Sequence, residues 1–181
     1  MTTAPIALFV YNRLEHTRKT VMALEKNLLA RESELFVFSD GPRNESDRDK
    51  VNSVRDYVRS ISGFKSVNTI DRRENWGLSK SIISGVTEII NRYGKIIVME
   101  DDLSSSPYFL QYMNDSLDLY KNENKVISVH GYVYPVKGEL PETFFLKNPS
   151  CWGWATWKRG WDLFEKDGQK LLEELERKQA L

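Results

Sequence analysis

The sequence predicts an α/β domain built on a mainly parallel central sheet. Three apolar runs and one weaker run, all of strand length, recur along residues 6–99, and a segment of helical periodicity follows each of them. Strand-then-helix units of this length are joined by right-handed crossovers, which bring the carboxyl ends of the strands to one edge of the sheet. Polar residues stand at several of these ends, and open α/β sheets bind their ligands at that edge.

The first half of the chain supplies the strand-and-helix units. The strands are expected at residues 6–11, 35–38, 65–70 and 96–99. Apolar residues recur at helical spacing after the first three strands, at Leu14, Val21, Leu24 and Leu28, at Val51, Val54, Val58 and Ile61, and at Ile82, Val86, Ile89, Ile90 and Tyr93. Ser46 followed by Asp49 is a capping-box signal for the start of the second helix, and Gly94 is placed to end the third.

The second half continues the alternation and then changes in character. Ser106 as N-cap and Pro107 at the first helical position predict a fourth helix. Its apolar face carries Leu110, Met113, Leu117 and Tyr120. Further strands are expected at 126–129 and 143–146, with 131–141 as the one loose connection.

The chain closes on a helical pattern that is still running where the sequence stops. The pattern is formed by Leu171, Leu172, Leu175 and Leu181. We therefore expect further structure beyond Leu181.

Length and composition exclude several classes of protein. A chain of 181 residues suits one domain with a substantial core. Lys+Arg and Asp+Glu both number 26, so the charge does not indicate a nucleic-acid partner. Cys151 is the only cysteine, so no internal disulfide forms and a reducing compartment fits. No apolar run approaches the ~18 residues of a membrane span, and no basic segment precedes the first one, so the sequence predicts a cytoplasmic protein.

An acidic turn is the strongest functional signal in the chain. Glu100, Asp101 and Asp102 come directly after the buried strand expected at 96–99. Like charges held a few ångströms apart destabilise one another where water is partly excluded. A divalent cation reverses this penalty, because clustered carboxylate oxygens are ligands for Mg²⁺ and Mn²⁺. We therefore expect the turn to hold a metal that in turn holds a diphosphate; a solvated acidic loop is the alternative.

Other polar residues at the same edge are candidates for nucleotide binding. The chain has no glycine-rich phosphate loop of the P-loop or G-x-G-x-x-G type, so a metal bridging carboxylate and diphosphate is favoured. Arg13 and Lys80 are cations available to phosphate, although both also suit a solvated surface. Asp40, which ends the second strand, suits either a base or ribose hydroxyl or the capping of its own turn.

The second half supplies aromatic and histidine candidates for a sugar or acceptor site. His130 follows a strand and suits a metal ligand, an acceptor contact or a hydrogen-bonded structural role, the last being favoured. Four of the five tryptophans, including Trp152 and Trp154, lie within ten residues. Aromatic faces pack on pyranose C–H groups but also dominate cores, so we expect most of these tryptophans in the core and one or two at the site.

Several of these motifs together resemble the GT-A glycosyltransferases. The matching stretches are residues 8–13 (Leu-Phe-Val-Tyr-Asn-Arg), 38–41, 75–77 and 98–103, the last including the Glu-Asp-Asp-Leu turn. The likeness is to bacterial family-2-like enzymes and to N-acetylglucosaminyltransferase I, and it covers most of residues 5–165. It implies a Rossmann-like three-layer sandwich, with 1–103 as the nucleotide-binding half and 104–181 as the donor-sugar and acceptor half.

The resemblance implies roles for individual residues. Asp102 is the implied metal ligand for Mn²⁺ or Mg²⁺, and Glu100 and Asp101 are implied to contact the nucleotide and its ribose. Arg13 and Asp40 occupy positions implied to read the base. The implied donor is a nucleotide-sugar, most simply a UDP-sugar, and the acceptor a glycan or a lipid-linked glycan, which is compatible with peripheral association with the inner face of the membrane.

An inverting transfer also needs a general base on the acceptor hydroxyl. In the family this base lies beyond the aromatic segment, and Asp162, Glu165 and Asp167 do not match it. We therefore expect the base beyond Leu181, and catalysis by the 181 residues alone stays open. Two alternative functions remain. A nucleotidyltransferase uses a similar sheet but needs a glycine-rich loop after the first strand, and a non-catalytic carbohydrate-binding module would need no nucleotide.

Overall fold

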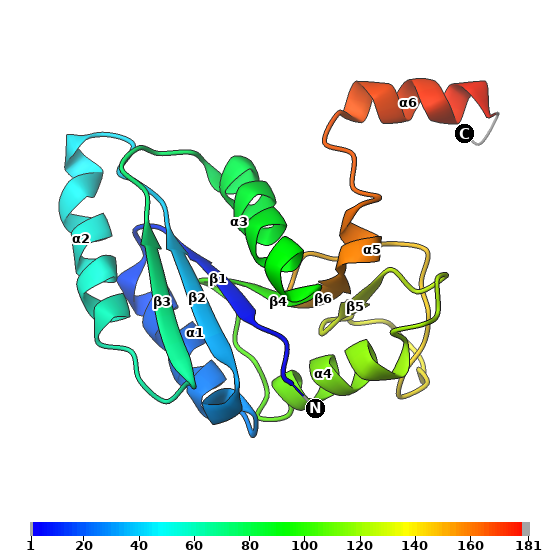
Figure 1. The fold of residues 1–181 in the computed structure, drawn as a ribbon, viewed down its shortest axis with the longest axis horizontal. Coiled ribbons are helices and arrows are strands. Elements are labelled where there is room, and N and C mark those ends of the chain that lie inside the picture. Colours follow the sequence, from blue (N-terminus) through cyan, green and yellow to red (C-terminus); the bar gives the residue numbers. More distant parts are fainter. Residues whose placement is uncertain (1, 179–181) are drawn as a thin grey trace.

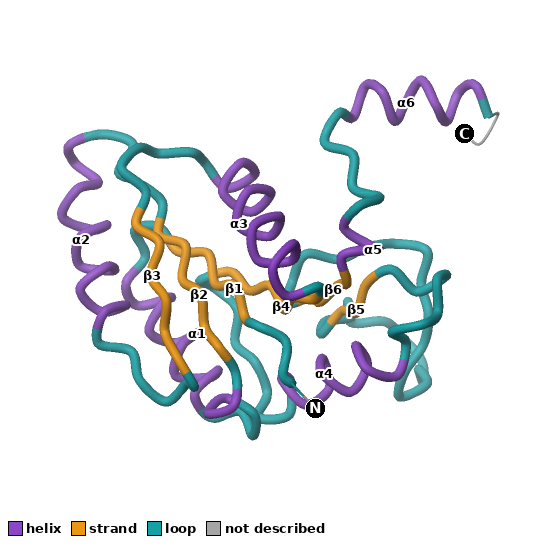
Figure 2. The backbone as a smooth tube through the Cα atoms, in the orientation of Figure 1, coloured by secondary structure: helices purple, strands orange, loops and turns teal. Residues whose placement is uncertain are grey.

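The computed structural model describes residues 2–178 and contains a six-stranded sheet with helices on both faces (Figure 1). The strand order is β3-β2-β1-β4-β6-β5. The strands are β1 (Ile6–Val10), β2 (Glu34–Ser39), β3 (Ser66–Asp71), β4 (Lys95–Glu100), β5 (Ser128–His130) and β6 (Trp154–Trp157). The strands β1 to β4 are parallel, and β6 runs antiparallel to both of its neighbours. Figure 2 shows β6 between β4 and β5 at one side of the sheet. The predicted α/β fold with a mainly parallel sheet is confirmed.

Helices cover the sheet as three layers require. They are α1 (Leu14–Glu25), α2 (Glu45–Arg59), α3 (Leu78–Tyr93), α4 (Phe109–Leu119), α5 (Lys158–Trp161) and α6 (Gly168–Arg177), with a 3₁₀ turn, η1 (Ala30–Glu32). One face packs against α1, α2 and α4, and the other against α3. Within residues 2–178, no helix has both the length and the apolar character needed to cross a bilayer.

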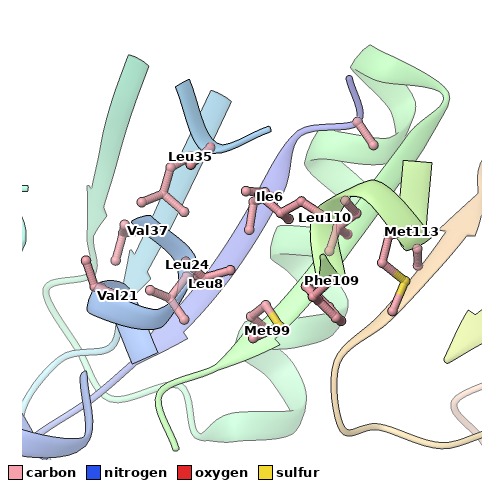
Figure 3. Packing of buried hydrophobic residues seen from close by; sticks show 14 of the residues in the cluster. Ile6, Leu8, Val21, Leu24, Leu35, Val37, Met99, Phe109, Leu110 and Met113 are labelled. Carbon is pink, nitrogen blue, oxygen red and sulfur yellow. The ribbon is translucent and has the colours of Figure 1, made fainter. Parts of the chain in front are cut away.

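The apolar runs read from the sequence are strands buried on both faces. In β1, Ile6 and Leu8 point to the layer of α1, α2 and α4, where they meet Met99 of β4 and Leu110 of α4 (Figure 3). Phe9, one residue on, points to the opposite layer, and its ring stacks on Phe38 of β2 at 5.0 Å between centroids. A strand with two apolar faces reads as an unbroken apolar run, which is why periodicity of two is absent.

Two helix starts differ from the sequence-based predictions. The side chain of Asn44, not Ser46, caps α2 by accepting a hydrogen bond from the amide of Asp47, and the Ser46 hydroxyl donates to Asn44. The helix expected to start at Pro107, with Ser106 as its cap, begins at Phe109 instead and has no side-chain cap. Before α4, the amide of Phe109 donates to the carbonyl of Ser106 at 3.1 Å, so Ser106 and Pro107 lie in a turn that precedes the helix, and helix boundaries commonly shift by one or two residues.

The second half of the chain departs further from expectation. No strand forms at 143–146, and the whole connection between β5 and β6 lacks helix or strand, so it is longer than the predicted 131–141. The strand β6 comes instead from the tryptophan-rich segment, which sequence reasoning did not assign to the sheet. The closing helix α6 is confirmed, with Leu171, Leu172 and Leu175 exposed on it, and Figure 1 shows it projecting from the body; Leu181 lies outside the described residues.

Gly85 in α3 allows the helix to approach the sheet. A Cβ at this position would lie 2.8 Å from the ring of Phe9 and 3.1 Å from that of Phe38. Gly85→Leu is expected to lower the free energy of unfolding, because overpacking against stacked rings costs about 1–3 kcal/mol, which exceeds the helix-propensity gain of roughly 0.8 kcal/mol. Urea unfolding measures the change. Ser84→Leu is the matched control. Ser84 precedes Gly85 in α3 and lines a surface hollow, so this change should leave the urea midpoint nearly unchanged.

Candidate functional site

The carboxyl ends of β1, β2 and β4 bring the predicted nucleotide-binding residues to one edge of the sheet. Phe9 pairs with Glu100 across β1 and β4, and Val10 pairs with Ser39 across β1 and β2. The amide of Asp40 continues this ladder by donating to the carbonyl of Val10 at 3.1 Å. The parallel register therefore sets the residues that follow β1 between Asp40 and the acidic turn.

An arginine neutralises part of the acidic turn. The guanidinium of Arg13 forms an ion pair with Asp101 Oδ1 and a second one with Asp102 Oδ2 at 3.1 Å. The side chain of Asp101 is only 5% exposed, whereas those of Arg13 and Asp102 are 46% and 43% exposed. The hydrogen bond from Arg13 to Asp101 is the largest of the effects that raise the pKa of Arg13, so the guanidinium stays charged. A buried carboxylate thus carries its counter-charge from the β1 loop.

Glu100 carries an unfavourable charge in the same turn. Its side chain alternates with that of Met99 and lies on the α3 side of the sheet, as does that of its partner Phe9. Burial raises the pKa of Glu100 most, and the charges of Asp102 and Asp101 raise it further, while Arg13 opposes them. Three carboxylates therefore face one arginine, and perturbed groups of this kind mark candidate functional sites.

The loop that carries Arg13 is fixed from both sides. The phenol of Tyr11 donates to Asp47 at 2.9 Å, and the amide of Asn12 donates to the same carboxylate at 3.0 Å. The carbonyl of Arg13 accepts hydrogen bonds from the amide and the hydroxyl of Thr17, both at 3.0 Å. The backbone of Arg13 is held between α2 and α1, and only its side chain has freedom to turn.

Asp40 fastens two loops at the edge. Its Oδ1 accepts hydrogen bonds from the amides of Gly41 at 2.9 Å and Trp76 at 2.8 Å, and its Oδ2 accepts one from Gly77 at 2.9 Å. The carboxylate is nearly buried. The structure thus shows the turn-capping role that the sequence left open, and contact with a base or ribose stays a prediction.

A cation–aromatic stack stands on the turn that Asp40 holds. The guanidinium of Arg72 lies 3.6 Å from the ring centroid of Trp76, and the ammonium of Lys80 lies 4.4 Å from it. The Nε and one terminal nitrogen of Arg72 are buried and find no acceptor among the described residues, and burial lowers the pKa of Arg72. Sequence reasoning missed Arg72; the signal was a basic residue directly after the third strand.

The candidates of the second half lie beside β4. Trp154 pairs with Val98 on one side and with His130 on the other, so all three share one face of the sheet. Trp154 stacks on Trp161 at 6.0 Å between centroids and is half-buried, which makes it largely a core residue. His130 is held by the Ser128 hydroxyl at 2.8 Å and by the Ser150 amide at 3.3 Å. This agrees with the structural role favoured for His130, and burial lowers its pKa.

Trp152 belongs to an exposed aromatic cluster with Tyr132 and Tyr134. Its ring lies 4.7 Å from that of Tyr132 and 5.4 Å from that of Tyr134, between centroids. The amide of Gly131 donates to the carbonyl of Gly153 at 2.8 Å, so the two ends of the long connection leave the sheet together. Because Trp154 pairs with Val98, this point lies next to the strand that ends in the acidic turn.

The residues near the end of the chain are engaged elsewhere. Asp162 pairs with Lys158 and Glu165 with Lys170, while Asp167 caps α6 by accepting from the amides of Gln169 and Lys170. Neither these two ion pairs nor the cap of α6 involves the acidic turn.

The acidic turn provides few metal ligands by itself. Within residues 2–178, no three histidine, cysteine, aspartate or glutamate side chains converge as ligands. The second oxygen of Asp101, however, is buried without a hydrogen-bond partner among these residues, and Asp102 is half-exposed beside it. Magnesium-type sites often use only one or two carboxylates and complete their coordination with substrate phosphates. The donor set therefore fits a cation that is bound together with a diphosphate.

Comparison with known proteins identifies the fold. No protein-family model and no curated protein sequence matches the chain. Among solved structures, it is similar to the mannosyltransferase PcManGT from Pyrobaculum calidifontis in complex with GDP-Man and Mn²⁺, with a TM-score of 0.52 and 9% identity over 70% of this chain and 34% of that one. It is also similar to a candidate nucleotide-diphospho-sugar transferase from Desulfovibrio desulfuricans G20, with a TM-score of 0.52 and 12% identity over 98% of this chain and 77% of that one.

These likenesses show a GT-A-like glycosyltransferase fold, which confirms that part of the predicted resemblance. The chain spans about a third of the length of the mannosyltransferase. The narrower resemblance to N-acetylglucosaminyltransferase I stays a prediction.

Asp40→Asn tests the turn-capping role of this residue. An asparagine offers one acceptor oxygen where the carboxylate uses two, and its NH₂ group would face a backbone donor. A buried N–H left without its acceptor costs about 1–3 kcal/mol. We expect urea unfolding to show a loss of this size. Asp56→Asn, a change of an exposed aspartate on α2 that pairs only with Arg59 among its ionic partners, should leave stability within about 0.5 kcal/mol.

His130 predicts a pH dependence of stability. Burial lowers its pKa in the folded protein, so the unfolded chain binds the proton more readily. Its contribution is then complete above the ordinary value of about 6.5 and is lost as the pH falls below it. We expect His130→Gln to flatten the dependence of Tm on pH between about 7.5 and 5. His16→Gln, at the exposed histidine of α1, is the control; an unchanged profile in the His130 variant would contradict the assignment.

Proposed function

We propose that the chain is the nucleotide-sugar-binding domain of a metal-dependent glycosyltransferase that moves a sugar to a glycan or a lipid-linked acceptor. The observation that carries this proposal is the acidic turn at the carboxyl edge of the GT-A-like sheet, with a buried, under-neutralised Asp101 beside a half-exposed Asp102. A fold alone does not fix a function, which depends on what this edge of the sheet can bind. The mannosyltransferase of similar fold holds GDP-Man and Mn²⁺, which supports a nucleotide-sugar donor and a divalent ion.

The nucleotide is assigned to the edge of the sheet between the β1 loop and the acidic turn. Glu100 and Asp101 are proposed to contact the nucleotide and its ribose, and Arg13 the base or the diphosphate. Arg72 adds buried N–H donors without acceptors, and such donors suit a carbonyl or phosphate oxygen. With Trp76 and Lys80 stacked beside it, this end of the site offers an aromatic face and two positive charges. A uridine nucleotide is our proposed donor carrier.

The metal is assigned to Asp102. A Mn²⁺ or Mg²⁺ ion held there with the diphosphate would neutralise charge that develops on the departing nucleoside diphosphate. The chain's own residues prepare this step: Asp101 fixes Arg13 at the turn, and the buried β4 strand holds all three carboxylates at the sheet edge. The fold holds the three carboxylates close together, and a bound cation would offset their repulsion.

The sugar and acceptor are assigned to the aromatic side of the edge. Trp152, in its exposed cluster with Tyr132 and Tyr134, offers ring faces to pyranose C–H groups, and Trp154 and His130 pair with each other in the adjoining strands. We propose inversion at the anomeric carbon, with a general base other than Asp162, Glu165 and Asp167. A cytoplasmic location is proposed from the composition of the chain, and peripheral association at the inner face of the membrane is proposed from the resemblance to the GT-A glycosyltransferases.

A carbohydrate-binding module is the second candidate, because the same exposed aromatic cluster would bind a glycan without any nucleotide. A nucleotidyltransferase is disfavoured, since Tyr11-Asn12-Arg13-Leu14 follows β1 where a glycine-rich loop would hold a triphosphate.

Thermal unfolding with nucleoside diphosphates tests the proposal. UDP with Mn²⁺ is expected to raise the Tm, and stabilisation of about 2.7 kcal/mol corresponds to a ligand at a hundredfold excess over its Kd. Asp102→Asn should remove the metal-dependent part of the shift, because it removes the proposed ligand oxygen. Asp115→Asn, at an exposed carboxylate on α4, should retain the shift.

Parallel arms use GDP, CDP and an oligosaccharide without nucleotide. Stabilisation by the oligosaccharide alone, with none by any nucleotide, would favour the carbohydrate-binding module. Nucleotide binding that is independent of metal and of Asp102 would contradict the proposed site.

A further inference from the structure

We propose that Arg13 is a resident counter-cation of the acidic turn: it competes with the divalent metal for Asp102 and turns onto the diphosphate when nucleotide and metal bind together. This inference rests on the proposed function and concerns the regulation of the same site. The structure carries it through the two ion pairs of Arg13, one to Asp101 and one to Asp102 at 3.1 Å. One guanidinium thus holds the carboxylate to which we assign the metal.

The charge balance of the turn shows that this arrangement is incomplete. Glu100, Asp101 and Asp102 stand against a single arginine at the end of β4. The side chain of Asp101 is only 5% exposed, and its Oδ2 has no hydrogen-bond partner among the described residues. A buried carboxylate oxygen without a donor carries an unfavourable free energy, so the turn would gain from further positive charge. A divalent ion supplies that charge without removing the pair between Arg13 and Asp101.

The mobility needed for the exchange is confined to one side chain. The carbonyl of Arg13 is held by two hydrogen bonds from Thr17, and the preceding Asn12 is tied to Asp47. The guanidinium itself is nearly half exposed, as is the carboxylate of Asp102. A long side chain on an anchored backbone can exchange partners without loss of the surrounding fold, because no helix or strand has to move.

The exchange is favourable only when metal and diphosphate arrive together. A metal ion alone must displace Arg13 from Asp102 and leave the guanidinium without that partner. A diphosphate offers the guanidinium a new bidentate partner and offers the metal further oxygen ligands. Metal and nucleotide are therefore expected to bind with positive coupling, and by linkage each raises the affinity of the other equally.

Direct titration of Mn²⁺ tests the exchange without any assay of transfer. Free Mn²⁺ is measured by electron paramagnetic resonance in the absence of nucleotide, with the wild-type chain and with Arg13→Met. We expect Arg13→Met to bind Mn²⁺ at least about tenfold more tightly, because a unit positive charge near the ligand has been removed. Adding Asp102→Asn to Arg13→Met should abolish this gain. Arg18→Met is the matched control, since Arg18 lies on α1 five residues after Arg13 and its side chain has a similar exposure of 49%.

A second titration in saturating UDP completes the test. UDP should tighten Mn²⁺ binding in the wild-type chain by a larger factor than in Arg13→Met, where no guanidinium is left to transfer. Arg13→Lys retains the charge on a single donor group and should fall between the two, and it carries the test if Arg13→Met does not fold by circular dichroism.

Equal or weaker Mn²⁺ binding in the folded arginine variants would overturn the inference. The proposed function is judged separately by the effect of UDP on the wild-type chain. Metal-dependent UDP binding with no change on substitution of Arg13 would leave the function supported and the exchange refuted.

Discussion

The crowding of three carboxylates at the end of one buried strand is the constraint on which the rest of the site depends. The β4 strand cannot move Glu100, Asp101 and Asp102 apart, because its apolar residues are buried between two helical layers. Like charges so placed are unfavourable unless cations compensate them. Arg13 from the β1 loop is the compensation that the chain itself supplies. The order of strands matters for this reason: β1 lies directly beside β4, so the loop after β1 is the one that reaches the turn.

Hydrogen bonds within the surrounding fold hold the loops at this edge in place. Few polar groups are left there to face a ligand. Asp40 closes the neighbouring loops with three backbone hydrogen bonds, and Asp47 ties the β1 loop to α2. The hydrogen bonds of these two carboxylates go to donors of the protein itself, and contact of Asp40 with a base or ribose stays a prediction. Asp101, Asp102 and Arg72 differ from them, because each retains an exposed atom or a buried polar atom without a partner. Buried polar atoms without a partner are rare in folded proteins, so those of Asp101 and Arg72 are candidates for binding a ligand.

Much of the fold could be predicted because its strands are buried on both faces and therefore read as unbroken apolar runs. The strands on the β5 and β6 side of the sheet were harder to predict. The strand β6 pairs with β4 through Trp154–Trp157, but a tryptophan-rich segment suits a core or a sugar site equally well. The expected strand at 143–146 has apolar residues and no neighbour to pair with, and pairing is a long-range property that local propensity does not contain. The acidic turn and Arg13 were found from motif and position, whereas Arg72 was missed because its environment, not its identity, makes it unusual.

The two sides of the proposed reaction are unequally developed in these residues, and this has a physical meaning. The leaving-group side has carboxylates at a strand end, a half-exposed arginine and buried donors, all placed by the parallel sheet. The acceptor side has an aromatic cluster on a long connection, while Asp162, Glu165 and Asp167 are engaged by lysines or by a helix start. Stabilising a departing diphosphate demands charges held at fixed positions, which strands provide. Accommodating an acceptor demands a surface that varies with the substrate, and that task suits a loop. The division between sheet and loop therefore follows from the chemistry proposed for each side.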